Sequence, residues 1–282
     1  MHIKAITYLG ENAREIARYY PSKRGSSGCG RKASKEEIER GNEKKRVRYM
    51  QRLIALNFKA GDWHLVLKYG VKKRPKSYED AQEDLRDFLA MMRQYYKGAG
   101  RLFKYIAVTE RGKRGALHHH LIIEDDKEVG TVTAVKSLWK GHTFFSEMYD
   151  YKGFRDLADY ICKKESKEEL EPHKARYKAS RNLIRPKTIR VPVFRRSWDE
   201  EPKAPAGWYV EKDSLINTTI KETGLPYQRY ILRRIAQTGQ QEPKNAQTAA
   251  AKAAGRILGR VENAAAILKD TWAYFKERRR RS

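Results

Sequence analysis

The sequence predicts an α+β protein built on an antiparallel sheet that carries helices on one face. Three observations predict this class. Between residues 63 and 170, stretches of alternating polarity, typical of strands, take turns with stretches of 3.6-residue periodicity, typical of helices. Two of the strands are joined by the short turn RGKRGA. The chain of 282 residues is long enough to bury a core of this kind.

The central region, residues 63–170, predicts the order strand, helix, strand, strand, helix, strand, helix. Ser77 caps the first of these helices, which ends at Gly98. This order contains the βαββαβ series of a ferredoxin-like, or RRM-like, fold. The predicted strands are 64–69, 104–110, 117–124 and 142–149, and the predicted helices are 77–98, 132–141 and 154–167.

The preceding segment, residues 1–62, is basic. We expect a short strand around residues 3–8, followed by a flexible basic loop. Ser34 and Glu37 match a capping box, which predicts an N-terminal basic helix at about 34–56. Its cations are typical of a solvated face and equally of a DNA contact.

The region after the core is interrupted by prolines. Residues 171–236 are interpreted as an extension packed on the core, with strands at 188–194 and 230–234. Residues 237–247 have the composition of a linker. Residues 248–282 are Ala-rich and predict a basic amphipathic helix, a C-terminal appendage that docks on the domain or on a second copy as a homo-dimer.

The charge of the chain points to a polyanionic partner. There are 61 Lys and Arg residues against 35 Asp and Glu, a net charge of +26. Because 17 Tyr and 5 Trp accompany these cations, nucleic acid fits better than a membrane surface. No apolar run reaches the ~18 residues of a membrane span. The charged start of the chain does not match a signal peptide, so we expect a cytoplasmic protein of a bacterial cell.

Cys29 and Cys162 are the two cysteines of the sequence, and they form no CxxC pair. This count indicates neither a disulfide framework nor a structural zinc cluster.

The run RGALHHHLIIED carries the clearest chemical signal. On a strand, His118 and His120 share one face, and His119 points to the other, beneath a helix. If the hairpin is symmetric about Arg114, Glu110 lies opposite His118 on the face of the outer histidines. Two imidazoles and a carboxylate bind a divalent metal and leave positions open for phosphate oxygens. Mg²⁺ or Mn²⁺ is our first choice, although Zn²⁺ accepts the same ligands.

A tyrosine near this site is the candidate nucleophile. Tyr160 and Lys163 stand three residues apart on the helix predicted at 154–167, and Tyr160 lies outside its apolar stripe. A nearby ammonium favours the phenolate, whose ordinary pKa is ~10. Lys164 is the alternative to Lys163, and Tyr149 and Tyr151 are competing nucleophiles.

The acidic residue, the turn, GALHHHLII and the later YICK resemble the metal and nucleophile motifs of HUH endonucleases, specifically the single-tyrosine replication-associated proteins of phages and plasmids. The resemblance covers roughly residues 1–235 and departs from the family where Lys68 stands in a motif that is usually Thr-rich. It implies a rolling-circle replication initiator that nicks one strand at an origin hairpin and joins Tyr160 to the 5′ phosphate. A free 3′ hydroxyl then remains for the host polymerase.

Other partners follow from the same interpretation. No Walker motif is present in the sequence, so unwinding requires a host helicase. The alternatives are a non-catalytic nucleic-acid-binding protein on the same fold, a metal-independent RNA-processing enzyme, and a strand transferase of the HUH transposase or relaxase type. The residues expected to contact single-stranded or hairpin DNA are Arg46, Arg48, Arg52, Lys68, Arg111, Lys113 and Lys164.

Overall fold

The computed structural model divides into two compact units, each built around its own sheet. Described residues within 1–57, 154–162 and 184–235 form the first unit, and those within 58–149 and 177–183 form the second. The residues that the structure describes are 1–21, 34–112, 114–149, 154–162, 177–220 and 224–235.

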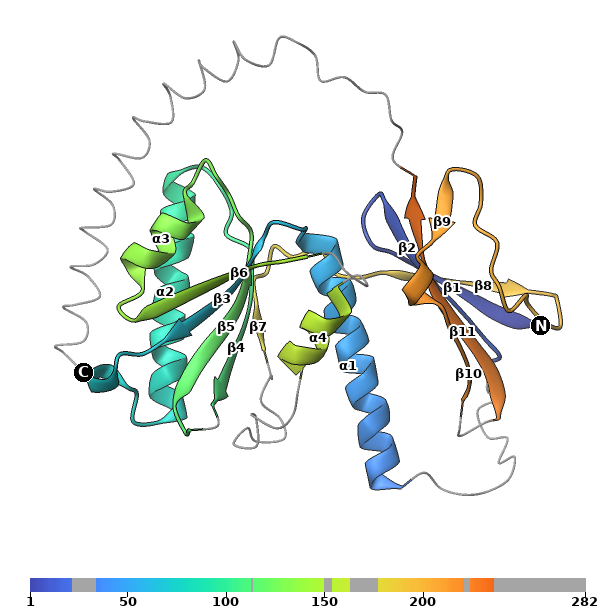
Figure 1. Cartoon of the computed structure of the whole chain (residues 1–282), viewed down its shortest axis with the longest axis horizontal. Helices are drawn as coiled ribbons and strands as arrows, with labels where there is room; N and C mark the ends of the chain where they lie inside the picture. Colours follow the sequence, from blue (N-terminus) through green and yellow to red (C-terminus); the bar gives the residue numbers. More distant parts are fainter. Residues whose placement is uncertain (22–33, 113, 150–153, 163–176, 221–223, 236–282) are drawn as a thin grey trace, which may run out of the picture. The chain divides into compact units, whose positions relative to one another are not determined.

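The second unit contains the predicted βαββαβ series. Its sheet has the order β6-β3-β5-β4-β7, and every pair of neighbouring strands is antiparallel (Figure 1). The first four of these are the fourth, first, third and second strands of the series, which is the ferredoxin-like order, so the predicted fold class is confirmed. The elements are β3 (Trp63–Lys68), η1 (Val71–Lys73), α2 (Tyr78–Gly98), β4 (Tyr105–Arg111), β5 (Leu117–Ile123), α3 (Thr131–Leu138), β6 (His142–Glu147) and β7 (Lys178–Ala179).

Helices α2 and α3 cover one face of this sheet (Figure 1). Leu65 and Leu67 of β3 and Leu121 of β5 are fully buried against them, because side chains alternate between the two faces of a strand. The predicted cap of α2 is present, since Ser77 and Asp80 form a reciprocal capping box. The opposite face of the sheet carries the polar side chains described below.

The first unit is built from strands that are distant in the sequence. Its sheet has the order β10-β11-β2-β1-β8, with β9 paired to β11. The expected strands at 3–8, 188–194 and 230–234 are all present in it, whereas β2 was not expected. The strands are β1 (His2–Tyr8), β2 (Ala13–Tyr19), β8 (Thr188–Val193), β9 (Trp208–Val210), β10 (Ile216–Ile220) and β11 (Leu225–Arg234), with η3 (Lys212–Ser214) between β9 and β10.

Two helices belong to the first unit. Helix α1 (Lys35–Asn57) begins at the predicted capping box, where Ser34 and Glu37 exchange hydrogen bonds of 2.9 and 3.2 Å. Helix α4 (Arg155–Cys162) packs against α1. It covers the first part of the helix predicted at 154–167, and the remainder lies outside the described residues.

Several predictions fall on parts of the chain outside the described residues. They are the basic loop, the linker at 237–247, the C-terminal helix at 248–282, Cys29, Lys113, Tyr151, Lys163 and Lys164. Among the described residues, none of the helices combines the length and the apolar character that a membrane crossing requires.

Candidate metal centre and nucleophile

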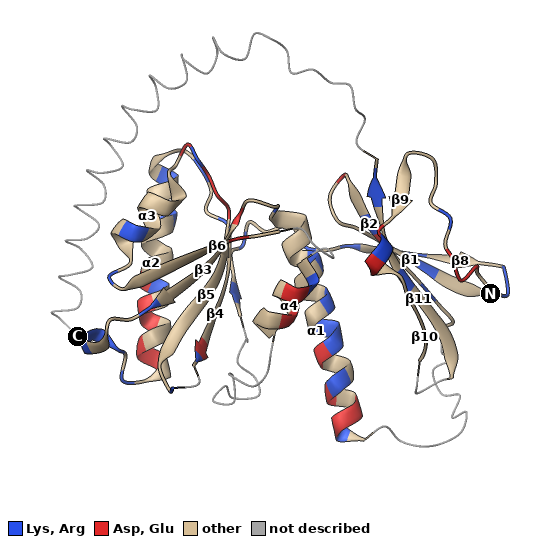
Figure 2. Cartoon of the chain, in the orientation of Figure 1, with Lys and Arg blue, Asp and Glu red and all other residues tan. Residues whose placement is uncertain are grey.

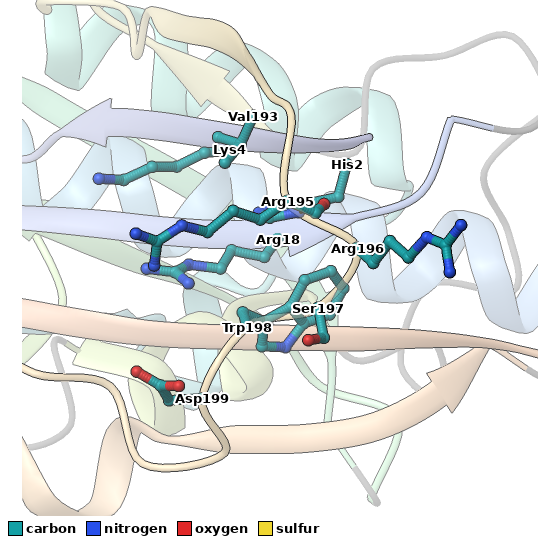
Figure 3. A pocket seen from close by; sticks show the side chains of 9 residues that line it. All are labelled: His2, Lys4, Arg18, Val193, Arg195, Arg196, Ser197, Trp198 and Asp199. Atoms are coloured by element: carbon teal, nitrogen blue, oxygen red, sulfur yellow. The ribbon is translucent and has the colours of Figure 1, made fainter.

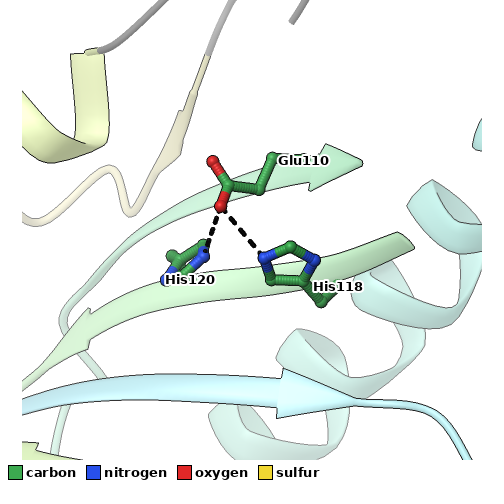
Figure 4. A group of neighbouring side chains, drawn as sticks. All are labelled: Glu110, His118 and His120. Carbon is green, nitrogen blue, oxygen red and sulfur yellow. Dashed lines mark hydrogen bonds and ion pairs between the residues drawn. The ribbon is translucent and has the colours of Figure 1, made fainter. Parts of the chain in front are cut away.

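The hairpin of β4 and β5 brings three polar side chains to one point. Glu110 pairs directly with His118, the register that symmetry about the turn predicted. Nε2 of His118 lies 2.9 Å and Nε2 of His120 lies 2.7 Å from the same carboxylate oxygen of Glu110 (Figure 4). The two imidazoles and the carboxylate therefore converge on the face of the sheet that α2 and α3 leave uncovered.

The donor set fits a divalent metal. The three ligand atoms lie within 4.8 Å of one another. The side chains are shielded without being sealed, at 14% exposed for Glu110, 15% for His118 and 5% for His120. Two neutral imidazoles and one carboxylate supply three ligands and leave other positions for water or phosphate. The group could bind a metal ion, and its identity is not fixed by these ligands.

His64 is a member of this cluster that the sequence analysis missed. Its Nε2 lies 3.1 Å from Nδ1 of His120, and the two rings stack with centroids 5.3 Å apart. Burial and the charge of His120 lower the pKa of His64 to about 4, against the opposing effect of Glu110. His64 is therefore neutral at neutral pH. When His120 binds through Nε2, its Nδ1–H donates to Nε2 of His64, the outer partner that fixes a ligating histidine.

Alternation along β3 placed His64 on the correct face, but the sequence did not show which strand lay beside it. His64 pairs in register with Ile122 of β5, two residues from His120. The strands are separated by a helix and another strand, so this neighbour became known only from the sheet order.

His119 lies on the helix-covered face, as predicted. It is fully buried, and its ring nitrogens lie 2.6 Å from the Tyr69 hydroxyl and 2.7 Å from the Thr109 hydroxyl. Its ring also meets that of Trp139 edge-on, with centroids 5.6 Å apart. Burial lowers the pKa of His119 to about 3, so this histidine is a neutral member of the core.

A cation and an aromatic ring lie beside the triad. Lys68 pairs in register with His118, and its Nζ lies 4.5 Å from the ring centroid of Phe144 on β6. Phe144 is 51% exposed. Arg111, at the end of β4, is exposed and donates to the carbonyl oxygen of Gly115 at 3.0 Å. Lys68 and Arg111 therefore lie in the same unit as the metal ligands.

Tyr160 belongs to the first unit, on α4. Ala158 and Ile161 of this helix are buried, whereas Tyr160 is 40% exposed, as its position outside the apolar stripe predicted. Phe154, directly before the helix, is buried and has a φ of 60°, an unusual conformation for a residue with a β-carbon.

The cations of α1 differ in their surroundings. Figure 2 shows that Lys and Arg are interspersed with Asp and Glu along this helix. The guanidinium of Arg52 donates to both carboxylate oxygens of the buried Glu15, at 2.7 and 3.1 Å. That of Arg48 lies 5.7 Å from the ring centroid of Tyr227. Nε and Nη2 of Arg46 are shielded from solvent and have no hydrogen-bond partner in the described part of the chain.

The comparison with known proteins points to replication. No curated protein and no solved structure matches this chain. A family model does match, over the segment that contains β3, the hairpin with its triad, and α4. The match supports a role in replication initiation. Residues 62–169, which include Glu110, His118, His120 and Tyr160, are similar to the family described as Replication-associated protein, of the ORF2 type.

Proposed function

We propose that this chain is a rolling-circle replication initiator that nicks single-stranded origin DNA by metal-dependent transesterification. The observation that carries the proposal is the convergence of His118 and His120 on one oxygen of Glu110. The match to a replication-associated family over the same residues supports it. The proposal makes the chain an endonuclease and strand transferase with one catalytic tyrosine.

In this proposal Glu110, His118 and His120 hold Mg²⁺ or Mn²⁺, with Zn²⁺ as the less favoured ion. Such an ion, when bound, polarises the scissile phosphate and offsets charge in the transition state. The residues have separate tasks. Glu110 supplies the negative charge that balances the ion, and the imidazoles add neutral ligands. His64 accepts from Nδ1 of His120 and so directs the Nε2 lone pair of that ring toward the ion.

Tyr160 is the nucleophile in this mechanism. Its phenol loses a proton, and the bond from its oxygen to phosphorus forms as the bond from phosphorus to the 3′ oxygen breaks. The 3′ oxygen takes up a proton, which leaves a free 3′ hydroxyl and a 5′-phosphotyrosine. One phosphoester replaces another, so a later 3′ hydroxyl can reverse the step and close a circle. We propose Lys163, with Lys164 as the alternative, as the cation that favours the phenolate.

The DNA contacts proposed for the second unit surround the triad. Lys68 supplies a charge for a phosphate, and the exposed Phe144 beside it offers a face on which an unpaired base can stack. Arg111 and Lys113, in and before the hairpin turn, add phosphate contacts.

In the first unit we propose phosphate contacts for Arg46 and Arg48 of α1. Arg52 is different, because its guanidinium is held by Glu15 with a side chain that is 19% exposed. We assign Arg52 a structural role instead of a DNA contact.

Host proteins complete the proposed reaction. The host polymerase extends the free 3′ hydroxyl, and a host helicase separates the strands.

The test is a search for the covalent intermediate. Labelled single-stranded DNA carrying a candidate origin is incubated with the full chain and Mn²⁺, and a denaturing gel reveals any DNA that remains bound to protein. Tyr160→Phe is expected to lose this adduct while it still binds DNA. The matched control is Tyr149→Phe, which removes a hydroxyl from a tyrosine that is 71% exposed and should keep the adduct. An adduct that persists in Tyr160→Phe and disappears in Tyr149→Phe would move the nucleophile.

A further inference from the structure

A cavity of about 490 Å³ lies on the first unit, between the start of β1 and the segment that follows β8 (Figure 3). This volume is within the range of pockets that hold small ligands. Its lining combines cations with an aromatic ring, including Lys4, Arg18, Arg195 and Trp198. None of the metal ligands or the proposed nucleophile takes part in it.

The charge of the cavity is one-sided. Four cationic side chains, those of Lys4, Arg18, Arg195 and Arg196, line it together with one carboxylate, that of Asp199. Lys4 and Arg18 are directly opposite one another on neighbouring strands, an arrangement of like charges that destabilises a sheet. Burial and the charge of Arg18 lower the pKa of Lys4. Within the described residues, no carboxylate lies within 4.0 Å of any of these four cations, so an anionic ligand would relieve their repulsion.

Hydrogen-bonding groups in the cavity also lack partners. His2 is 1% exposed, and its Nδ1–H donates to the carbonyl oxygen of Arg195 at 3.1 Å. Its Nε2 and the Nε of Arg18 are buried and have no hydrogen-bond partner in the part of the chain that the structure describes. In Figure 3 the charged ends of Lys4, Arg18 and Arg195 extend in the same direction. Such a set of donors suits phosphate oxygens.

Aromatic rings adjoin these donors. Trp198 contacts the ring of His2 edge-on, with centroids 4.8 Å apart, and lies 5.3 Å from that of Tyr20. The hydroxyl of Tyr20 donates to the carbonyl oxygen of Arg196, which holds this segment against β2. Phe194, next to the cavity-lining Val193, is 85% exposed. Cations that track a backbone and rings that accept bases are the two components of single-strand binding surfaces.

We propose that this cavity is a second DNA-contact site, which holds the backbone of single-stranded DNA at Lys4, Arg18 and Arg195 and a base against Trp198. The inference rests on the proposed function for its ligand class, single-stranded DNA. It goes beyond that function because it assigns DNA binding to a part of the first unit that lies outside the segment with the family match. Its role is to hold DNA, and the chemistry of nicking does not require it.

The test measures binding without cleavage. Labelled oligo-dT is titrated with the full chain in EDTA, by fluorescence anisotropy, over a series of salt concentrations. The pocket variant is Lys4→Gln with Arg195→Gln, and the matched control is Lys97→Gln with Lys136→Gln, which removes two exposed cations from α2 and α3 of the other unit. Because each phosphate contact on a single strand contributes about 0.7 to the salt slope, the pocket variant should lose about 1.4. We also expect its affinity to fall roughly ten-fold more than that of the control.

Stacking is tested separately. Trp198→Ala should weaken oligo-dT binding by roughly five-fold or more, and Trp198→Phe, which keeps a ring, should restore most of it. Thermal unfolding of each variant shows whether the first unit is still folded.

The outcomes separate this inference from the proposed function. A pocket variant that binds oligo-dT as tightly and with the same salt slope as the control would overturn the inference, whether or not the chain nicks DNA. If calorimetry also shows that inorganic phosphate binds to the unmodified chain and not to the pocket variant, the cavity serves a free anion. Weakened binding in a chain that forms no covalent adduct would support the inference and refute the proposed nicking.

Discussion

His64 offers the sharpest test of how the metal centre is built. The perturbation is His64→Leu, which keeps a side chain of similar size and removes the acceptor at 3.1 Å from Nδ1 of His120. His120 is 5% exposed, so water cannot readily replace that partner. A buried donor left without a partner costs about 1–3 kcal/mol, which is roughly 5- to 150-fold in an equilibrium constant. Losses of the outer partner of a ligating histidine typically lie at about 10–100-fold.

The two values agree, so we expect Mn²⁺ to bind His64→Leu about 10–100-fold more weakly than the unmodified chain. Titration of free Mn²⁺ by electron paramagnetic resonance measures this directly. The dependence of nicking on Mn²⁺ concentration should shift by the same factor, with the rate at saturating Mn²⁺ reduced less. His64→Gln is the matched variant, because its amide oxygen can accept from His120 and should recover part of the affinity. Equal Mn²⁺ affinity in the Leu variant and the unmodified chain would show that His64 does not orient the ligand.

Three further predictions concern stability and activity. Glu15 is buried, which raises its pKa, but Arg52 and neighbouring guanidinium groups lower it by more, to below 4.5. Its ionised form therefore stabilises the fold above pH 4.5, and this contribution is lost as the pH falls through the lower pKa of the folded state. Glu15→Gln should reduce the free energy of unfolding in urea at pH 7 by about 3–5 kcal/mol, and a deficit of the same size at pH 3 would contradict this assignment. Gly141→Ala would place a β-carbon 2.0 Å from a backbone carbonyl oxygen, whereas one at Gly70 meets no atom within 4 Å. The first substitution should lower the unfolding free energy by about 1–3 kcal/mol or more and the second by much less, and equal thermal shifts would argue against the close approach. His120→Ala should abolish Mn²⁺-dependent nicking and leave DNA binding in EDTA unchanged, while His142→Ala, an exposed histidine of the same sheet, should still nick.

Local signals in the sequence predicted the second unit well. The capping residues Ser34 and Ser77 mark the starts of the two long helices, because each cap involves residues only three apart. The opposition of Glu110 and His118 was also predictable, since the turn that joins their strands fixes the register.

The first unit was harder to predict because its pairings are distant. Strand β1 pairs with β8, and β2 with β11, and neither partner is marked by the residues near it. Strand β2 also carries Glu15 on a buried face, where it is paired with Arg52 and Arg229. In the sequence such a residue indicates solvent, so the alternation that would reveal the strand is obscured. The same distance in sequence concealed the contact of His64 with His120.

The three adjacent histidines of β5 tie the proposed chemistry to the integrity of the core. His118 and His120 serve the exposed face, and His119 lies in the core with Tyr69 and Thr109. A slip of one residue in the pairing of β4 and β5 would exchange these roles, taking ligands into the apolar interior and a core histidine out of it. The length of the connecting turn is thus as important as the ligands themselves. Insertions there should be tolerated only when the extra residues bulge away from the strands, and any change that shifts the register removes metal affinity and folding stability in the same step.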